Sequence, residues 1–273
     1  MTPLDPTPFH ALRRHLRIWR RFVSQAIVRE THYRASAITT TLVGLFQLVI
    51  ALVPIFLLYS FTDDINGWSR GDVIALGGIY QATVAMLWFG IEPNMGRLSD
   101  AIREGELDLI LIRPVSGLFY VMLRWIKPAE VFMILAGLGV AGVGLAQGGS
   151  RPDAAGLFQA ALLMGCGLVL ISCAWTAIVM TAFWFTSTSP AAMVVSDLIF
   201  TGRYPLNFYP TAIRFFLSFI FPIGFAATFP VEALTGRGSW GIVFTGAALS
   251  VLALALLRAW WRFGVRSYSS ASS

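Results

Sequence analysis

Long stretches without a charged side chain constrain this sequence more than any other feature. Residues 37–61 contain none over 25 positions, and further uncharged stretches cover 73–91, 131–150, 154–196, 215–231 and 238–257. About 20 helical residues, at about 1.5 Å each, cross the roughly 30 Å hydrocarbon core of a bilayer. Backbone polar groups must be paired there, and the chain lacks the period-two alternation of a membrane β-barrel. We therefore predict an all-α polytopic membrane protein with six transmembrane helices.

The charged residues indicate how the chain crosses the membrane. Charged residues make up only 12% of the chain, with mean hydropathy +0.71 and formal net charge +6. Fifteen of the 20 cationic residues lie on one side of a six-span chain: Arg13, Arg14, Arg17, Arg20, Arg21, Arg29, Arg34, Arg97, Arg103, Arg113, Arg124, Lys127, Arg258, Arg262 and Arg266. Cytoplasmic loops carry an excess of such residues. We therefore expect both termini to be cytoplasmic, and we interpret the net charge as a topology signal rather than as a nucleic-acid-binding surface.

The N-terminal region, residues 1–36, is predicted to contain an interfacial amphipathic helix over 9–30. Apolar residues recur at spacings of three and four, and arginines occupy the opposite face: Leu12, Leu16, Trp19, Val23 and Ile27 against Arg13, Arg14, Arg17, Arg20 and Arg21. Such a helix lies in the membrane interface with its cations near anionic headgroups. The alternative is a basic tail that only fixes orientation.

Residues 37–262 are expected to form one transmembrane domain, followed by a cytoplasmic tail at 263–273. The first three spans are predicted near 37–61, 73–91 and 128–147, with polar outer turns at 63–72 and 148–153 and a cytoplasmic connection at 92–127. A fourth span precedes the break at Ser187-Thr188-Ser189-Pro190, a short fifth follows it, and the sixth covers about 240–261. Ser189 and Pro190 suit the N-cap and first position of the fifth helix.

The segment 208–235 is apolar but interrupted by Pro210, Pro222 and Pro230. We expect it to be an outer re-entrant segment that enters and leaves the membrane from the same side, because proline breaks helices. A rival topology places 187–211 in the cytoplasm and makes 211–230 the fifth span. Charge alone prefers the rival, which moves Arg203 and Arg214 inside.

Familiar catalytic patterns are missing from the sequence. All three histidines precede the first span, and no serine lies in a G-x-S-x-G pattern. Lys127 is the only lysine and follows no phosphate-binding glycine loop, so ATP hydrolysis would have to occur on another polypeptide. We expect no metal, no cofactor and no catalytic residue on this chain. Asp197, the one acid well inside an apolar run, should face protein or water because a midplane acid costs roughly 2.5–3.5 kcal/mol.

The most informative polar segment is 98–114, LSDAIREGELDLILIRP. Ser99 could cap a short helix whose acidic tip, Glu104, Glu106 and Asp108, surrounds Gly105. Its apolar flank would comprise Ile102, Leu107, Leu109 and Leu111, and Arg113-Pro114 would end it. Such an element suits docking into a groove of a cytoplasmic partner, although a solvated interfacial loop explains the pattern equally well.

Two motifs resemble the permease subunits of type-2 ABC exporters, in particular a branch with short six-span permeases. The first motif is Ile102…Gly105-x-Leu107-Asp108-x-x-Leu111-x-Arg113-Pro114-Val115. The second is Arg203-Tyr204-Pro205-Leu206…Tyr209-Pro210…Arg214…Pro222…Phe229-Pro230…Leu234-x-Gly236-Arg237. The order of elements is similar over essentially the whole chain.

The resemblance implies a division of labour between subunits. It makes 98–114 the coupling helix that contacts a separate ATP-binding subunit, present in two copies and carrying the ATP and Mg²⁺. The coupling residues would be Ile102, Glu104, Gly105, Glu106, Leu107, Asp108, Leu111, Arg113 and Pro114. A second permease, identical or a sister chain, would complete the path in the cytoplasmic (inner) membrane of a bacterium. The outer gate would comprise Tyr204, Pro205, Pro210, Pro222 and Pro230.

Polar residues inside the predicted spans are candidates for the lining of a path: Gln47, Gln81 and Thr83. Small and hydroxyl residues also serve ordinary helix packing, so this role is one of two readings. The leading hypothesis is an ATP-driven exporter permease. The alternative, from another class, is a non-transporting membrane anchor that recruits cytoplasmic proteins through 92–127.

Overall fold

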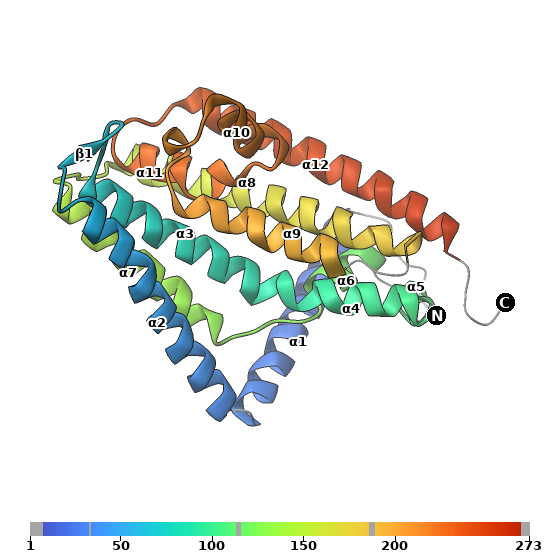
Figure 1. Ribbon diagram of the computed structural model, residues 1–273. Helices are drawn as coiled ribbons and strands as arrows, with labels where there is room; N and C mark the ends of the chain where they lie inside the picture. Colours follow the sequence, from blue (N-terminus) through green and yellow to red (C-terminus); the bar gives the residue numbers. More distant parts are fainter. Residues whose placement is uncertain (1–7, 33, 113–115, 186–188, 269–273) are drawn as a thin grey trace.

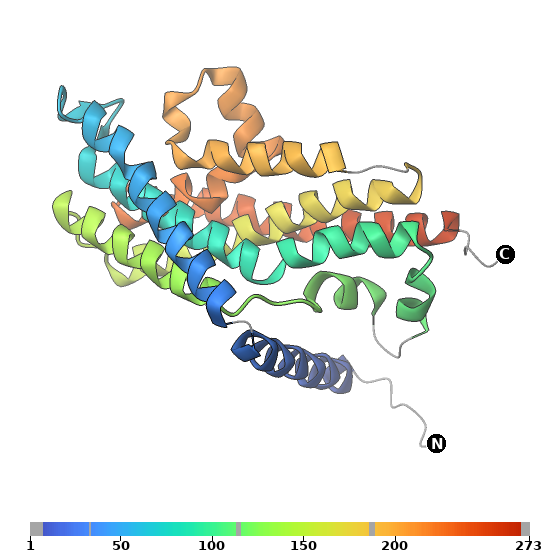
Figure 2. The ribbon, with the colours of Figure 1, turned by 60° about the horizontal axis from the view of Figure 1, so that its bottom comes forward.

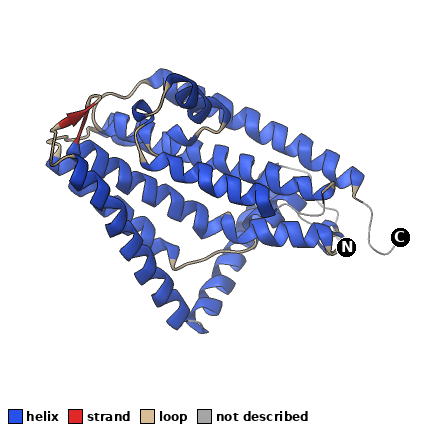
Figure 3. Cartoon of the chain, viewed as in Figure 1, coloured by secondary structure: helices blue, strands red, loops and turns tan. Residues whose placement is uncertain are grey.

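The computed structural model describes residues 8–32, 34–112, 116–185 and 189–268. In chain order the elements are α1 (Pro8–His32), α2 (Arg34–Leu58), β1 (Asp64–Ile65), β2 (Trp68–Ser69), α3 (Arg70–Gly90), α4 (Glu92–Arg103), α5 (Leu107–Leu111), α6 (Gly117–Leu123), α7 (Glu130–Gln147), α8 (Ala154–Val179), η1 (Met180–Phe183), α9 (Ser189–Phe200), η2 (Thr201–Arg203), η3 (Leu206–Phe208), α10 (Thr211–Phe215), η4 (Phe216–Ile220), η5 (Ile223–Ala226), α11 (Thr228–Leu234) and α12 (Trp240–Ser267). Helices dominate, and the strands form one small hairpin (Figure 3).

Helices α3, α4, α8 and α12 run along one common direction and give the molecule two ends, whereas α1 and α2 lie at an angle to them (Figure 1). We call the end that carries β1 and β2 the hairpin end, and the opposite end, where α12 ends, the terminal end. The turn between α7 and α8 lies at the hairpin end, and α4, α5 and α6 lie toward the terminal end. The predicted outer turns and the predicted cytoplasmic connection are therefore at opposite ends of the bundle.

Within the described part of the chain, five helices are long and apolar enough to cross a membrane. They are Ala37–Leu58, Arg70–Arg103, Glu130–Gln147, Ala154–Phe183 and Trp240–Ser267. The predicted fifth span corresponds to α9, which has only 12 residues and begins at Ser189, while residues 187 and 188 of the predicted break lie outside the described ranges. The prediction of an all-α polytopic membrane protein is confirmed.

A tight hairpin forms the polar outer turn predicted over 63–72. Asp64 pairs with Ser69, and Asn66 and Gly67 form the turn with φ values of 53° and 81°. Positive φ at both turn residues is the geometry that Asn-Gly favours in two-residue hairpins. Ser69 then caps α3, because its side chain accepts the N–H of Asp72 while Asp72 accepts the N–H of Ser69. The Asn-Gly pair is the sequence signal that could have predicted the hairpin.

Small residues let α3 and α7 pack with their backbones in close contact. A Cβ added to Gly78 would lie 2.3 Å from the Ala141 nitrogen, and one added to Gly144 would lie 2.3 Å from the Ala75 nitrogen. Gly137 lies on the same face of α7, where a Cβ would be 2.6 Å from the nitrogen of Ala82. Close approach through small residues is how helices associate in lipid, where the hydrophobic effect gives no net drive. These two helices are the rigid centre of the bundle.

Helix α1 lies at a steep angle to the bundle near its terminal end (Figure 1). Phe22 and Ala26 are its buried contacts, and they pack with Ile126 in the connection that precedes α7. Leu16 and Ile27, part of the predicted apolar stripe, are 57% and 50% exposed. Val23 of the stripe packs against the same cluster, so the stripe is divided between contact with the bundle and exposed residues such as Leu16 and Ile27.

The segment between α9 and α12 begins and ends at the hairpin end. Asn66 donates to the carbonyl of Asn207 (3.4 Å) at its start, and Arg237 donates to the carbonyl of Gly67 (2.7 Å) after its end. Between these contacts the chain reaches deep among the helices, where Phe225 packs on Gly167 of α8. The segment thus enters and leaves the bundle at the same end, and the expected entry of this re-entrant segment into the membrane stays a prediction. The rival topology, which puts 187–211 at the other end of the bundle, disagrees with the position of Asn207.

Candidate functional site

Helix α2 diverges from α3 toward the terminal end (Figures 1 and 2). Two hollows lined by residues of both helices lie between them. The larger measures about 380 Å³ and the smaller about 210 Å³. Residues that line both are Gly44, Gln47, Tyr80, Gln81 and Arg203. We call the two together the α2–α3 hollows. They are lined by both polar and apolar residues of the spans.

Two of the three predicted lining residues are found there. Gln47, near the middle of α2, and Gln81, near the middle of α3, both line the hollows. Thr39, Thr40 and Thr41 line the larger hollow nearer the terminal end, together with Glu130 at the start of α7. The hollows therefore carry amide and hydroxyl groups along the exposed side of α3.

Thr83 does not line either hollow, so this part of the prediction is wrong. Its side chain is fully buried, and its hydroxyl lies 2.7 Å from the carbonyl oxygen of Ala226 and 2.9 Å from that of Ile79. Thr83 points to the opposite side of α3 from the hollows, because it lies two positions after Gln81, about 200° around the helix. It attaches the deepest part of the re-entrant segment to α3.

The predicted outer-gate residues lie along the start, middle and end of the re-entrant segment. Tyr204 lines the smaller hollow, and Pro205 is buried just before η3. Pro210 precedes α10, Pro222 precedes η5, and Pro230 lies buried within α11. Only Tyr204 touches the hollows, and the prolines divide the segment into short helices.

The acidic residues of 98–114 lie at a corner between two helices rather than on one helix. Helix α4 begins at Glu92-Pro93 and ends at Arg103, so Ser99 lies inside it and the expected N-cap there is wrong. Gly105 turns the chain with a φ of +80°, which only glycine adopts without strain, and α5 follows. Arg113 and Pro114 lie outside the described residues.

We call the corner formed by residues 102–112 the tip. Ile102 and Leu107 are buried and attach it to the bundle, while Glu104 and Glu106 are exposed and Asp108 is half-buried. Leu109, Leu111 and Ile112 are exposed on α5, at 61%, 37% and 78%. The predicted apolar flank is thus divided into a buried pair and an exposed group. Acidic and apolar side chains together face away from the protein.

The end of α12 lies beside the tip. The ring of Tyr268 lies 6.2 Å from that of Phe183, and burial together with the charge of Asp108 raises the pKa of the Tyr268 hydroxyl. The tip is therefore held from two sides, by α4 and by the residue that follows α12.

The tip is connected to the wall of the hollows through helices α4 and α3. Helix α4 follows α3 after the single residue Ile91, and together they form one apolar rod of 34 residues from Arg70 to Arg103. Asn94 is 1% exposed and fixes this junction through its side-chain amide. The tip is thus joined by continuous helix to α3, which carries Tyr80 and Gln81.

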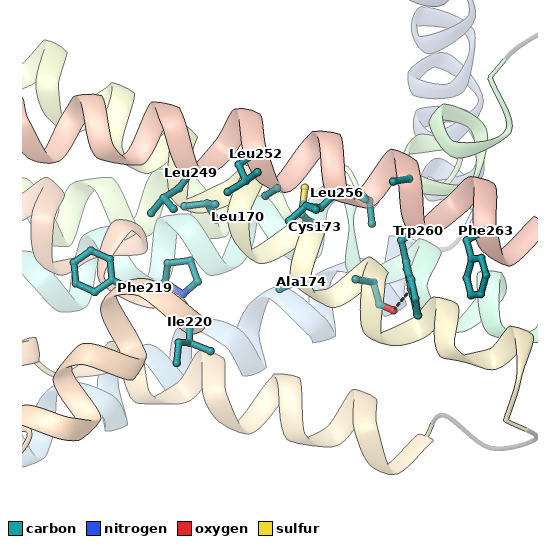
Figure 4. A pocket seen from close by; sticks show the side chains of 15 residues that line it. Leu170, Cys173, Ala174, Phe219, Ile220, Leu249, Leu252, Leu256, Trp260 and Phe263 are labelled. Atoms are coloured by element: carbon teal, nitrogen blue, oxygen red, sulfur yellow. Dashed lines mark hydrogen bonds between the residues drawn. The ribbon is translucent and has the colours of Figure 1, made fainter.

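A third concavity, of about 640 Å³, lies between α8 and α12 (Figure 4). Its lining contains no charged residue, and the only hydrogen bond drawn there joins Trp260 Nε1 to the carbonyl of Ala177 at 3.1 Å. Leu170, Leu249 and Leu256 cover its walls. The groove offers apolar contact and no group that could select a polar ligand.

Comparison with protein families gives one match. Residues 45–272 match the family model described as ABC-2 family transporter protein. The chain belongs to the ABC-2 transporter family. Comparisons with curated proteins and with solved structures returned no match.

Membership of the ABC-2 transporter family agrees with the resemblance noted in the two sequence motifs. It identifies the chain as the permease component of an ABC transporter, integral to the membrane. An ATP-binding partner is implied by that class. Sequence reasoning missed two residues of the α2–α3 hollows, Tyr80 and Arg203, although Arg203 opens the second motif. It also missed Asn94. A single lone amide beside a proline gives no periodic signal, so only the fold could identify it.

Proposed function

We propose that this ABC-2 permease forms half of the translocation path of an ATP-driven exporter. The tip docks on a separate ATP-binding subunit, which is present in two copies and binds the ATP and Mg²⁺. A second permease, the same chain or a sister, supplies the other half. The membrane is the bacterial inner membrane, with the terminal end in the cytoplasm and the hairpin end outside.

The exposed tip is the observation that carries this proposal. Glu104 and Glu106 project from a corner whose other side is attached through the fully buried Leu107. Exposed Leu109 and Ile112 lie next to them. Large apolar side chains rimmed by charge mark protein interaction sites. An ATP-driven movement at the tip would reach the hollows through the α3–α4 rod, whereas a passive anchor needs no such connection.

Two exposed surfaces support a second permease. Asp197 is exposed on α9 within an otherwise apolar helix, and an acid facing lipid costs roughly 2.5–3.5 kcal/mol near the bilayer centre. A protein or water-filled surface opposite α9 removes that cost. Helix α2 likewise has few buried residues: only 11% of its most apolar 18-residue stretch is buried, so most of its surface is free for lipid or a partner chain.

The test of coupling replaces Glu104, Glu106 and Asp108 together with alanine. The chain is purified with the ATP-binding subunit encoded beside it, and co-purification and transport-linked ATPase activity are measured. We expect both to fall, since each lost charged contact in an interface weakens it. Asp63→Ala, which removes an exposed acid at the hairpin end, should change neither. Undiminished assembly and turnover in the triple variant would remove the tip from the mechanism.

The orientation is tested with single cysteines in a Cys166→Ala/Cys173→Ala background. A cysteine at exposed Asp63 should react with a membrane-impermeant thiol reagent from outside the cell, and one at exposed Glu104 only after the membrane is opened. The opposite pattern would reverse the proposed topology.

A further inference from the structure

Arg203 is a cation within the described bundle that faces the α2–α3 hollows without a carboxylate to balance it. Its guanidinium carbon lies 4.6 Å from the ring centre of Phe200 and 5.9 Å from that of Tyr80. Ion pairs join Lys127 to Glu92 and Arg237 to Asp72 across the described ranges, and none involves Arg203. Glu130 lines the larger hollow as well, but it is not within ion-pair distance of Arg203. Arg203 is exposed, so its guanidinium is open to the hollows, and a cation beside membrane-spanning helices is a candidate counter-charge for an anion.

Tyr80 lies behind Arg203 in the wall of the hollows. It is 4% exposed, and its buried hydroxyl interacts with the Arg203 side chain without meeting the full geometry of a hydrogen bond. The hydroxyl therefore helps to position the guanidinium and is not itself open to the hollows. Gln47 and Gln81, which also line both hollows, add amide groups that can donate.

The fold holds Arg203 in place. Gly202 precedes Arg203 and packs so closely that an added Cβ would lie 2.6 Å from Ile223 and 3.2 Å from the Tyr80 ring. Tyr209 holds the same turn by donating to the carbonyl of Thr201 at 2.8 Å. The guanidinium is therefore positioned by packing and by the backbone.

The rest of the larger hollow is mainly apolar. Val43, Val84, Trp88 and Met133 line it around the polar groups. A guanidinium with adjacent amide donors matches the oxygens of a phosphate or carboxylate. The apolar walls match a hydrocarbon body attached to that group.

We propose that the α2–α3 hollows bind an amphiphilic anion, with Arg203 as counter-charge, the Gln47 and Gln81 amides as further donors, and Tyr80 as a residue that positions the Arg203 guanidinium. The inference rests on the proposed function in taking the hollows as part of the translocation path, and it assigns anionic amphiphiles as the substrate class. The same chemistry occurs in the headgroup of an anionic lipid and in a separate amphiphilic anion.

Binding is measured on the full chain in uncharged detergent, with dodecyl phosphate as the probe and dodecyltrimethylammonium as its cationic counterpart. Calorimetry should give dodecyl phosphate an affinity for Arg203→Gln roughly tenfold to a hundredfold below that for the unmodified chain. Arg203→Lys should retain part of the affinity. Arg214→Gln, which removes an exposed arginine of α10 that lines neither hollow, should bind like the unmodified chain.

Tyr80→Phe separates a binding role from a structural one. The variant removes the hydroxyl that interacts with the Arg203 side chain, so dodecyl phosphate affinity should fall while the thermal unfolding temperature changes little. Equal dodecyl phosphate affinity in the unmodified chain, Arg203→Gln and Tyr80→Phe would overturn the proposal. Equally tight, competitive binding of dodecyltrimethylammonium would also overturn it.

Nanodiscs distinguish the two sources of the anion. Loss of probe binding when phosphatidylglycerol is added to phosphatidylcholine would assign the site to a lipid headgroup, and undiminished binding would assign it to a separate amphiphilic anion. Each result supports an anion site. Because the permease is tested alone, these outcomes do not depend on assembly with an ATP-binding subunit, and the alanine substitutions in the tip should leave them unchanged.

Discussion

The side-chain amide of Asn94 forms hydrogen bonds with both backbone polar groups of Trp125. Its Nδ2 donates to the Trp125 carbonyl and its Oδ1 accepts the Trp125 N–H, each at 2.8 Å, and Nδ2 also donates to the carbonyl of Gly90 at 2.8 Å. One buried residue thus joins the end of α3, the start of α4 and the connection before α7. Three guanidiniums, those of Arg29, Arg97 and Arg124, surround the Trp125 ring at 4.9, 3.7 and 5.0 Å.

Replacing Asn94 should loosen the α3–α4 junction. Asn94→Ala leaves both Trp125 groups without this partner, at a cost of about 1–3 kcal/mol for each group that stays buried. We expect a lower thermal unfolding temperature and a loss of substrate-stimulated ATPase activity in the assembled transporter. Gln147→Ala removes an exposed amide from α7 and should be neutral. An Asn94→Ala variant as stable and active as the unmodified chain would contradict a role in coupling.

The α3–α7 contact should tolerate no added methyl group. Gly78→Ala or Gly144→Ala places a Cβ 2.3 Å from backbone nitrogen of the facing helix, so the helices must separate. Overpacking of this kind costs about 1–3 kcal/mol or more. Gly142→Ala lies on the same α7 helix with nothing within 4 Å and should be neutral or slightly stabilising, as Ala favours helix. Thermal unfolding of the purified variants compares them, and equal effects at Gly142 and Gly144 would exclude close packing as the cause.

Thr83 should hold the re-entrant segment in place. Thr83→Val preserves shape but removes the hydroxyl that lies 2.7 Å from the Ala226 carbonyl, leaving a buried acceptor at a cost of about 1–3 kcal/mol. Hydrogen exchange of backbone amides over 221–231 should become faster. Thr245→Val is the matched control, because that exposed hydroxyl bonds only to Gly241 of its own helix. Unaltered exchange in Thr83→Val would show that packing alone fixes the segment.

Arg237 links the end of the re-entrant segment to the hairpin. It bonds to Gly67 at 2.7 Å, to Asp72 at 3.1 Å and to Thr235 at 3.0 Å, and it lies over the ring of Trp68. Lysine has one ammonium group and cannot reproduce this fork.

Because Arg237 is exposed, Arg237→Lys should lower global stability by less than about 1 kcal/mol. Local opening should nevertheless increase, seen as faster hydrogen exchange over 65–72 and 228–237. Arg151→Lys, at an exposed position in the turn between α7 and α8, serves as control. Exchange rates that are the same in both variants would argue against a link between the two segments.

Tyr59 should make stability fall at high pH. Burial, followed by the charges of Asp64 and Asp72, raises the pKa of Tyr59 to about 12, and its hydroxyl donates to the Trp68 carbonyl at 2.8 Å. The folded state therefore holds the proton more tightly than the unfolded chain, where the pKa is about 10. This stabilisation is complete below pH 10 and is lost as the pH rises from about 10 toward about 12.

The measurement is the ultraviolet titration of tyrosinate in the unmodified chain minus that of Tyr59→Phe. The difference should show one ionisation near pH 12 in the folded protein and near pH 10 in denaturant. A difference step at the same pH in both states would mean that Tyr59 is not shielded in the hairpin.

Local sequence patterns predicted most of the helices, but they did not predict where every helix begins or ends. The charge-free stretches located the long helices, and the prolines of 208–235 predicted a broken segment, because lipid permits few alternatives to helix. The N-cap predicted at Ser99 was wrong: a serine before an acidic residue resembles an N-cap, but the helix already begins at Glu92-Pro93. The Asn66-Gly67 pair indicates a hairpin, which was not predicted.

The sequence by itself determined the class, the approximate limits of the five long spans, and the family, since these depend on hydropathy and short motifs, whereas the predicted fifth span, α9, has only 12 residues. Only the tertiary structure decided that Thr83 faces Ala226, that Asn94 bridges to Trp125, and that Arg203 faces the α2–α3 hollows. Each of these contacts joins residues more than 30 positions apart or depends on which face of a helix is covered. A uniformly apolar helix gives no periodic signal of its buried face, so the packing of its neighbours makes that choice.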